Sequence, residues 1–182
     1  MKKQNDLLVS SSMLQLRFVV LFLIAVLING CAVEQEREVP FIREAFPYEC
    51  GPRCLQMIYQ YHGVDTNFDQ IARQTRMSPE EGTSFLSLVK SAEANDFKTL
   101  AVRLTYDNQE EDKASLLDVP LPCVAFWEGN YFIVVEQAQA DSIDIIHPDQ
   151  GKQRLSKEAF EEGWASADKS EGLLLLLEKN QR

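Results

Sequence analysis

The stretch that decides the fold of this chain is Glu44-Ala45-Phe46-Pro47-Tyr48-Glu49-Cys50-Gly51-Pro52-Arg53-Cys54-Leu55-Gln56-Met57-Ile58. Its pattern predicts a short loop that runs into a helix spanning roughly residues 50–62. Gly51 and Pro52 suit the first helical turn, because the N–H that proline lacks has no partner there in any case. Beyond them, apolar residues recur every three to four positions, which predicts a helix face packed against a core. Gly63 is typical of the residue that follows a helix C-terminus.

Cys50 falls in the first turn of this predicted helix. The positive end of the peptide dipoles lies there and lowers the pKa of a thiol, and a nucleophilic cysteine is usually mounted in this way. A second interpretation is that Cys50 is a small buried apolar residue, as free cysteines commonly are. The spacing alone leaves both interpretations open.

The first 30 residues have the pattern of an export signal and lie outside the predicted domain. Basic residues precede the apolar run 18–28, which is shorter than the ~20 residues that span a bilayer. The run ends in Leu27-Ile28-Asn29-Gly30-Cys31, which resembles a bacterial lipoprotein signal. In that pattern the new N-terminal cysteine, here Cys31, is the lipid-attachment residue.

The alternative is a signal anchor that stays in the membrane, and translation starts at either Met1 or Met13. Both interpretations place the domain outside the cytoplasm and tethered to a membrane. No Asp follows Cys31, which favours transfer to the outer membrane in the lipoprotein pattern. We therefore expect a signal peptide over residues 1–30, a tether over residues 31–38, and one domain over residues 39–182. That domain would face the periplasm from the bacterial cell envelope through its lipid anchor.

The charge of the chain limits its partners. The formal net charge is −10 and residues 1–30 carry three basic and one acidic residue, so the remainder carries −12. An acidic domain without a basic stripe argues against nucleic acid and anionic lipid as partners. Neutral or cationic peptides remain as candidate ligands. The acidic run over residues 110–112 is interpreted as a solvated face.

The cysteines indicate neither a disulfide framework nor a metal site. Three of them, Cys50, Cys54 and Cys123, remain beside Cys31, and three thiols cannot all pair with one another. A bridge between Cys50 and Cys54 has awkward geometry within a helix. A zinc site built from Cys50, Cys54 and His62 has no standard spacing and no clear fourth ligand. We therefore expect no metal and no cofactor, and we interpret Cys123 as a core residue.

The chain places its helices first and most of its strands second. Further helices are predicted over residues 67–74, from Thr83 or Ser84 to Asn95, and after Ser156 as N-cap. Strands are predicted over residues 99–104, 122–127, 131–136, 142–146 and 173–177. This order is typical of an α+β fold, in which N-terminal helices pack on an antiparallel sheet.

Four sequence blocks, in order and at consistent separations, carry a family resemblance. They are residues 49–63 around Cys50, Gly82-Thr83-Ser84 with the strand that follows, Leu121-Pro122-Cys123 leading to Gly129-Asn130-Tyr131, and His147-Pro148-Asp149-Gln150-Gly151. Together they resemble the papain-like, bacteriocin-processing (double-glycine) cysteine peptidases, family thirty-nine of the cysteine peptidases. The resemblance covers residues 39 to about 178. It implies a papain-like fold with a cleft between the helices and the sheet.

Active members of that family cut after a Gly-Gly pair in a secretion leader peptide. They use a Cys nucleophile, a His base, an Asp that orients the His, and a Gln that helps to bind the oxyanion. Carried over position by position, Cys50 falls on the nucleophile, Asn130 on the His, His147 on the Asp and Glu44 on the Gln. Only one of the four positions keeps the residue that the family uses.

These replacements predict impaired catalysis. Asn130 has no nitrogen that can take a proton from a thiol. Glu44 places a negative charge where an oxyanion needs hydrogen-bond donors. We therefore predict a degenerate peptidase domain that acts as a peptide- or protein-binding module, with a secretion leader as one candidate ligand in its cleft.

Two further hypotheses remain. In the first, the domain is an active cysteine peptidase with a rearranged site, in which His147 reaches Cys50 and Asn130 orients the imidazole ring. In the second, the chain is a structural lipoprotein of the cell envelope whose cleft is filled by Phe46, Tyr48 and Trp127. Trp127 and Tyr131 flank Asn130, where they either line the cleft or belong to the core.

Overall fold

The computed structural model describes residues 37–107, 114–165 and 171–180. Residues 38–182 form one compact unit, and the fold described here is the fold of that unit. The predicted signal peptide, Cys31 and the acidic run 110–112 lie outside the described residues. None of the described helices is both long enough and apolar enough to cross a membrane.

The four α-helices in the described residues lie close to their predicted ranges. The first helical turn is a short 3-10 helix, η1 (Pro47–Glu49), which leads directly into α2 (Cys50–Tyr61). The next two helices are α3 (Phe68–Gln74) and α4 (Phe85–Ala94), and α5 (Lys157–Trp164) follows much later. The side chains of Asn67, Ser84 and Ser156 accept N–H donors at the starts of α3, α4 and α5, which satisfies groups that a helix terminus leaves open. Gly63 follows α2 with a φ of 69°, as the sequence predicts.

In the part of the chain that the structure describes, six strands form one antiparallel sheet in the order β1-β6-β2-β3-β4-β5. Their bounds are β1 (Phe97–Leu104), β2 (Cys123–Trp127), β3 (Tyr131–Ala138), β4 (Ser142–His147), β5 (Gly151–Ser156) and β6 (Gly172–Lys179). Five of them match predicted strands to within a few residues. The prediction lacks β5 because this strand lies at the edge of the sheet and most of its side chains are polar and solvent-accessible, so it has no apolar pattern to detect.

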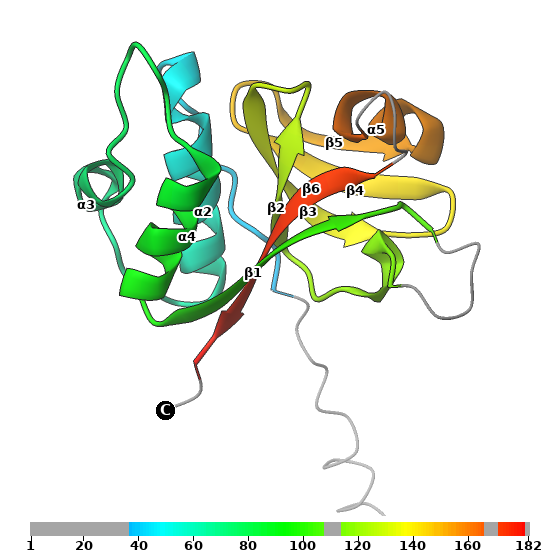
Figure 1. The fold of residues 1–182 in the computed structure, drawn as a ribbon, viewed down its shortest axis with the longest axis horizontal. Helices are drawn as coiled ribbons and strands as arrows, with labels where there is room; N and C mark the ends of the chain where they lie inside the picture. Colours follow the sequence, from blue (N-terminus) through cyan, green and yellow to red (C-terminus); the bar gives the residue numbers. More distant parts are fainter. Residues whose placement is uncertain (1–36, 108–113, 166–170, 181–182) are drawn as a thin grey trace, which may run out of the picture. The chain divides into compact units, whose positions relative to one another are not determined.

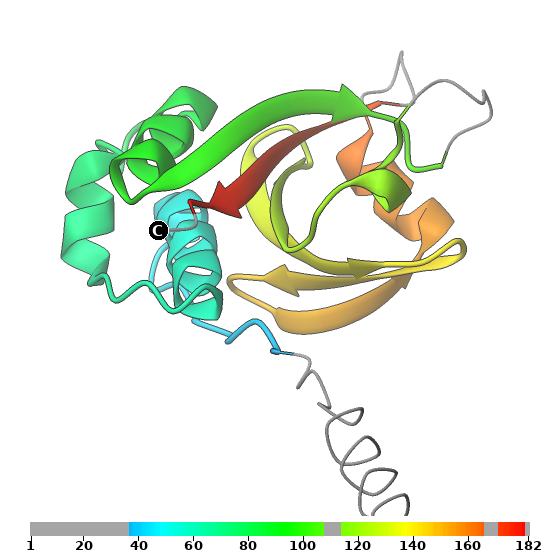
Figure 2. The same ribbon diagram turned by 90° about the horizontal axis from the view of Figure 1, so that it is seen from below.

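The two faces of the sheet bury separate cores. One core lies between the sheet and the N-terminal helices and contains Leu55, Ile58, Leu88, Phe132 and Val134. The other lies on the opposite face, where α5 packs, and contains Cys123, Ile133, Ile145, Phe160 and Trp164. Figure 1 shows α2, α3 and α4 grouped together on one side and α5 at the other end of the sheet. In Figure 2 the strands curve strongly between these two helical groups.

The placement of Trp127 corrects one expectation. Successive residues of a strand point to opposite faces of the sheet. Trp127 therefore shares a face with Cys123 and packs against Phe160, with ring centroids 5.5 Å apart. This face is opposite α2, so Trp127 does not fill a cleft beside Cys50. The interpretation of Cys123 as a core residue is confirmed, since it is fully buried.

Helix α2 packs very closely on the sheet at its first turn. A Cβ atom added at Gly51 would lie 3.1 Å from side-chain carbons of both Leu88 and Phe132. Glycine at this position therefore lets the N-terminus of α2 approach β3 and α4 more closely than any larger residue would. The same contact fixes Cys50 against the start of β3.

Candidate functional site

Two of the three replaced family positions, Glu44 and His147, line a small cavity at the N-terminus of α2. This cavity has a volume of about 270 Å³ and is lined by Glu44, Ala45, Phe46, Pro47, Tyr131, His147 and Asp149. The segment before η1 forms one wall, and the backbone N–H of Glu44 donates to the carbonyl of Pro148 at 3.1 Å. This bond joins the N-terminal segment to the turn between β4 and β5. The starts of α2 and β3 and the end of β4 thus converge on one place.

Cys50 is the first residue of α2 and is only 6% exposed. Burial raises the pKa of its thiol to about 11, and the negative charge of Glu44 acts in the same direction. The backbone N–H groups of Phe132 and Gly51 favour the thiolate but do not offset burial. The expectation that the helix terminus lowers this pKa is therefore wrong, because burial removes water from the sulfur and no imidazolium lies beside it. Cys50 does not bridge to Cys54, and both thiols are free.

Glu44 is almost fully buried at 9% exposure. The hydroxyl of Tyr131 donates to its Oε1 at 2.6 Å, whereas its Oε2 is buried without a hydrogen-bond partner in the described part of the chain. Burial raises the pKa of this carboxyl, the bond from Tyr131 opposes that rise, and the charges of Asp149 and Glu49 add to it. The position that the resemblance assigns to an oxyanion donor thus carries an acceptor.

Asn130 lies in the turn between β2 and β3 and is exposed to solvent. Its backbone N–H donates to the carbonyl of Trp127 at 3.2 Å, which closes the turn. Glu128 and Gly129 complete this turn with φ values of 47° and 75°. No side-chain hydrogen bond joins Asn130 to another described residue, so its amide does not orient His147 through a hydrogen bond.

His147 ends β4 and lies against Tyr131, with ring centroids 4.6 Å apart and nearly parallel planes. Its Nδ1 accepts from the backbone N–H groups of Asp149 and Gln150 at 3.3 and 3.4 Å. Burial lowers the pKa of the imidazole, although Asp149 and Glu128 act in the opposite direction. Within the described residues no hydrogen bond joins His147 to Cys50, and neither side chain is among the causes of the other's pKa shift.

Tyr131 is the residue that sequence reasoning left undecided. Its ring covers His147 and its hydroxyl reaches Glu44, so it joins two of the replaced positions across 87 residues of sequence. Burial and the neighbouring acceptor Glu44 strongly raise the pKa of this phenol, so it stays a donor. Tyr131 follows Asn130 in the sequence block that resembles the family's His strand, so the sequence indicates that Tyr131 lies near the site. Nothing in the sequence indicates that its hydroxyl bonds to Glu44.

Cations balance the other carboxylates near the cavity. Arg53 contacts Glu49 at 2.9 Å, and both side chains are largely buried. Asp149 contacts Arg43 at 3.3 Å at the exposed rim, where Arg43 also donates to the Asp149 carbonyl. No group of three or more His, Cys, Asp or Glu side chains among the described residues has the spacing to hold a metal ion.

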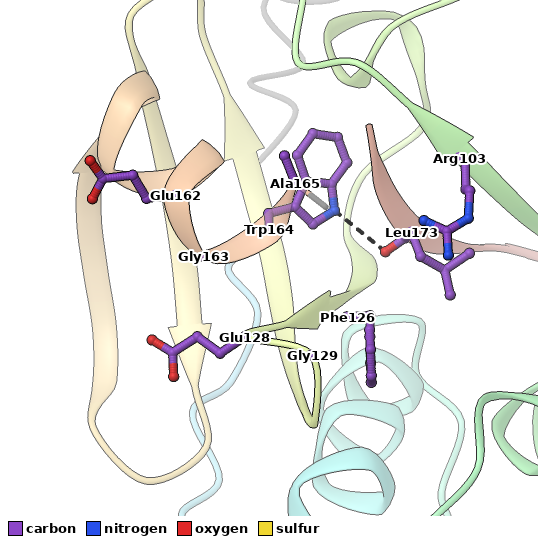
Figure 3. A pocket seen from close by; sticks show the side chains of 9 residues that line it. All are labelled: Arg103, Phe126, Glu128, Gly129, Glu162, Gly163, Trp164, Ala165 and Leu173. Atoms are coloured by element: carbon purple, nitrogen blue, oxygen red, sulfur yellow. Dashed lines mark hydrogen bonds between the residues drawn. The ribbon is translucent and has the colours of Figure 1, made fainter. Parts of the chain in front are cut away.

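A second cavity lies on the other side of the β2–β3 turn. It has a volume of about 430 Å³ and is lined by Arg103, Phe126, Glu128, Gly129, Glu162, Gly163, Trp164, Ala165 and Leu173. Figure 3 shows the side chains of Glu128 and Glu162 pointing away from Arg103, and the indole of Trp164 donating to the carbonyl of Leu173. No histidine is among the residues that line this cavity. The candidate site is therefore the smaller cavity, which is lined by His147 and by Glu44, whose charge acts on the Cys50 thiol.

Comparisons with known proteins show the family to which this chain belongs. Residues 38–181 match the model of the peptidase C39 family. The mesentericin-Y105 transport/processing ATP-binding protein of Leuconostoc mesenteroides is 30% identical over 134 residues, which cover 70% of this chain and 18% of that protein. The transport/processing ATP-binding protein ComA of Streptococcus pneumoniae is 34% identical over 123 residues, or 64% of this chain and 16% of that protein. The chain thus spans less than a fifth of these relatives.

Solved structures show the same fold. A double-glycine motif protease from a transporter, in complex with its leader peptide, aligns with a TM-score of 0.68 and 20% identity over 81% of this chain and 96% of that one. The peptidase domain of Streptococcus ComA aligns with a TM-score of 0.64 and 20% identity over 78% and 99% of the two chains. The fold is therefore papain-like. The chain belongs to the peptidase C39 family, and residues 38–181 form a domain similar to the peptidase domains of these transport/processing proteins.

Proposed function

We propose that this domain binds an extended peptide or protein segment beside Cys50 and does not cleave it at an enzymatic rate. The observation that carries this proposal is the state of the nucleophile position. The Cys50 thiol is buried, its pKa is raised to about 11, and no described side chain that can accept its proton is hydrogen-bonded to it. A cysteine peptidase needs the opposite of each of these properties.

The predicted loss of rate is large because three contributions are missing together. A positioned general base contributes about 10²–10⁴-fold, and one oxyanion donor contributes about 10²–10³-fold. The thiolate itself is scarce at neutral pH. Such losses are not additive when the groups act as a unit, yet each single loss already takes the rate far below that of a working peptidase.

The rearranged active site has less support. For it, His147 would have to take the proton of Cys50 while Asn130 orients the ring. In the structure, the described contacts of the His147 ring are with Tyr131 and with the backbone of its own turn, and Asn130 is exposed in another turn. The structural-lipoprotein hypothesis also has less support, because the three aromatic side chains that it requires do not fill a cleft together. Phe46 stacks on Tyr48 with 53% of its surface exposed, and Trp127 belongs to the opposite face of the sheet.

A peptide ligand is supported by three observations. A structural neighbour was solved in complex with a leader peptide. The chain is acidic, at −10 overall, which favours basic segments. Exposed aromatic surface at Phe46 borders the cavity and offers an apolar contact for an extended chain. The proposed ligand is therefore a basic or neutral extended segment, with a secretion leader as the first candidate.

We also propose that the domain is anchored in the cell envelope through a lipid on Cys31, facing the periplasm from the outer membrane. The support is the apolar run followed by Leu27-Ile28-Asn29-Gly30-Cys31. Expression in a bacterium with radiolabelled palmitate tests this proposal. Label on the wild-type chain and none on a Cys31→Ser variant supports it. Equal labelling of both, or of neither, contradicts it.

The binding proposal is tested with Gly-Gly-containing leader-type peptides, by following fluorescence anisotropy and product formation in the same samples. We expect saturable binding, no product over hours, and the same Kd for wild type and Cys50→Ser. Turnover that depends on Cys50 would contradict the proposal. Absence of binding by every peptide in the series would also contradict it.

A further inference from the structure

The cavity beside Cys50 contains one buried carboxyl group, that of Glu44, which forms no ion pair with a described residue. Arg53, whose positive charge acts on Glu44, is already paired with Glu49, and Asp149 is paired with Arg43. Glu44 has only the hydroxyl of Tyr131, which occupies Oε1. Its Oε2 is buried without a hydrogen-bond partner in the described chain, although Glu44 lines the cavity.

An unpaired buried carboxylate is costly, and two things can relieve that cost: a proton on the carboxyl, or a cation from outside the protein. We propose that the cavity binds a primary ammonium group of the ligand, with the free oxygen of Glu44 as its charged acceptor. This inference rests on the proposed peptide-binding function and names the chemistry that the site recognises. Where the family resemblance places an oxyanion donor, this chain would instead recognise a positive charge.

The geometry favours an ammonium over a guanidinium. A guanidinium binds carboxylates best through two parallel hydrogen bonds. Glu44 offers one free oxygen, because Tyr131 donates to the other at 2.6 Å. An ammonium is a compact point charge that a single carboxylate oxygen can accept. The exposed carboxylate of Asp149 lies at the rim of the cavity, partly neutralised by Arg43.

The size and lining of the cavity fit one lysine side chain or the N-terminus of one peptide. The cavity volume of about 270 Å³ lies just below the ~300–1,000 Å³ of sites for drug-sized ligands. Its walls include the rings of Phe46, Tyr131 and His147, which can pack against an aliphatic stem and attract a cation through their faces. The ammonium belongs either to a lysine side chain or to the N-terminus of a peptide, and the two sources are separable by experiment.

The test measures the anisotropy of two Gly-Gly-containing peptides with the full chain in neutral detergent. One peptide has a free N-terminus and no lysine, and the other has an acetylated N-terminus and a lysine beside the Gly-Gly pair. Each is compared with a form in which its single ammonium is acetylated, which leaves the protein untouched. We expect acetylation of the recognised ammonium to raise the Kd at least about tenfold, the effect of losing a charge-assisted hydrogen bond.

The variant Glu44→Gln keeps the shape of the side chain and removes its charge. This variant should raise the Kd for the peptide with the recognised ammonium by a similar factor. Acetylation of that peptide should then no longer change its Kd for the variant. The matched control Glu38→Gln should change the Kd less than about threefold, because that carboxylate is exposed, paired with Lys152 and not among the residues that line the cavity. If Glu44→Gln binds as tightly as wild type or more tightly, Glu44 holds a proton and the inference is overturned. The inference is also overturned if acetylation changes the Kd of wild type for neither peptide.

A second measurement separates this inference from the proposed function. n-Butylammonium chloride should raise the Tm of wild type above its value in equal concentrations of sodium chloride and 1-butanol, and should not do so for Glu44→Gln. If no peptide binds but this shift is present, the peptide-binding function fails and the ammonium site stands. If peptides bind and the shift is absent, the ammonium site fails alone.

Discussion

The reactivity of Cys50 offers a quantitative prediction. At pH 7.5, a thiol with a pKa of about 11 is ~0.03% thiolate, whereas an ordinary cysteine with a pKa near 8.5 is ~10% thiolate. The thiolate is the form that reacts with iodoacetamide. Ionisation alone therefore predicts that native Cys50 is alkylated roughly 300-fold more slowly than glutathione. Its 6% exposure should slow the reaction further.

The assay follows iodoacetamide labelling over pH 6–10, with mass spectrometry of peptides to separate Cys50 from Cys54 and Cys123. The rate at Cys50 should rise about tenfold per pH unit with no plateau below pH 10, because the thiolate fraction rises in that proportion below the pKa. In denaturing urea the rate should approach that of glutathione. The His147→Ala variant should label like wild type, since no described contact joins His147 to Cys50.

A plateau reached below pH 7 would refute this reasoning, because it would show a low-pKa thiolate at the N-terminus of α2. Loss of that plateau in His147→Ala would further identify His147 as the base and would favour the rearranged peptidase. Fast labelling without a plateau would indicate instead that Cys50 is far more accessible than its burial implies.

Three other predictions concern stability and the separation of the two faces of the sheet. Gly51→Ala should lower the free energy of unfolding by about 1–3 kcal/mol in urea titrations, because the added carbon would lie 3.1 Å from Leu88 and Phe132; an unchanged midpoint would show that α2 can shift. Gly163→Ala should destabilise by a comparable amount through Trp127, 2.4 Å from the added carbon, without changing peptide Kd at 20 °C, and a changed Kd would link the two faces. Because burial raises the pKa of Glu44 in the folded state, its stability cost is absent below the unfolded pKa near 4.3 and grows as pH rises through the folded pKa. Glu44→Gln should therefore gain stability relative to wild type as pH rises from 4 to 8, and a difference that is flat with pH would mean that folding does not raise the pKa of Glu44.

Local sequence signals predict the elements of this fold well. Ser156 caps α5 as expected, and Ser84, one of the two predicted candidates, caps α4, because capping depends on residues only three positions apart. Asn67, which the sequence predicts as the first residue of a helix, caps α3. Apolar alternation likewise predicts the central strands. The sequence does not predict the edge strand β5, because most of its side chains are polar. This strand forms through its pairing with β4.

The site is harder to predict because its properties arise from contacts that are distant in sequence. The helix position of Cys50 is local, but its raised pKa follows from burial beneath β3 and from the charge of Glu44. The bond from Tyr131 to Glu44 joins residues 87 positions apart. Trp127 shows the same limit, since the sequence places it on a strand but does not indicate which face of the sheet meets α2.

The most direct test of the central claim compares hydrolysis of one Gly-Gly leader-type peptide by wild type, by Cys50→Ser and by the triple variant Glu44→Gln/Asn130→His/His147→Asp. The triple variant carries the residue types that the family uses at all four positions. The account predicts that wild type and Cys50→Ser share the same background rate, and that only the triple variant gains cleavage after the Gly-Gly pair. A wild-type rate well above that of Cys50→Ser would contradict it.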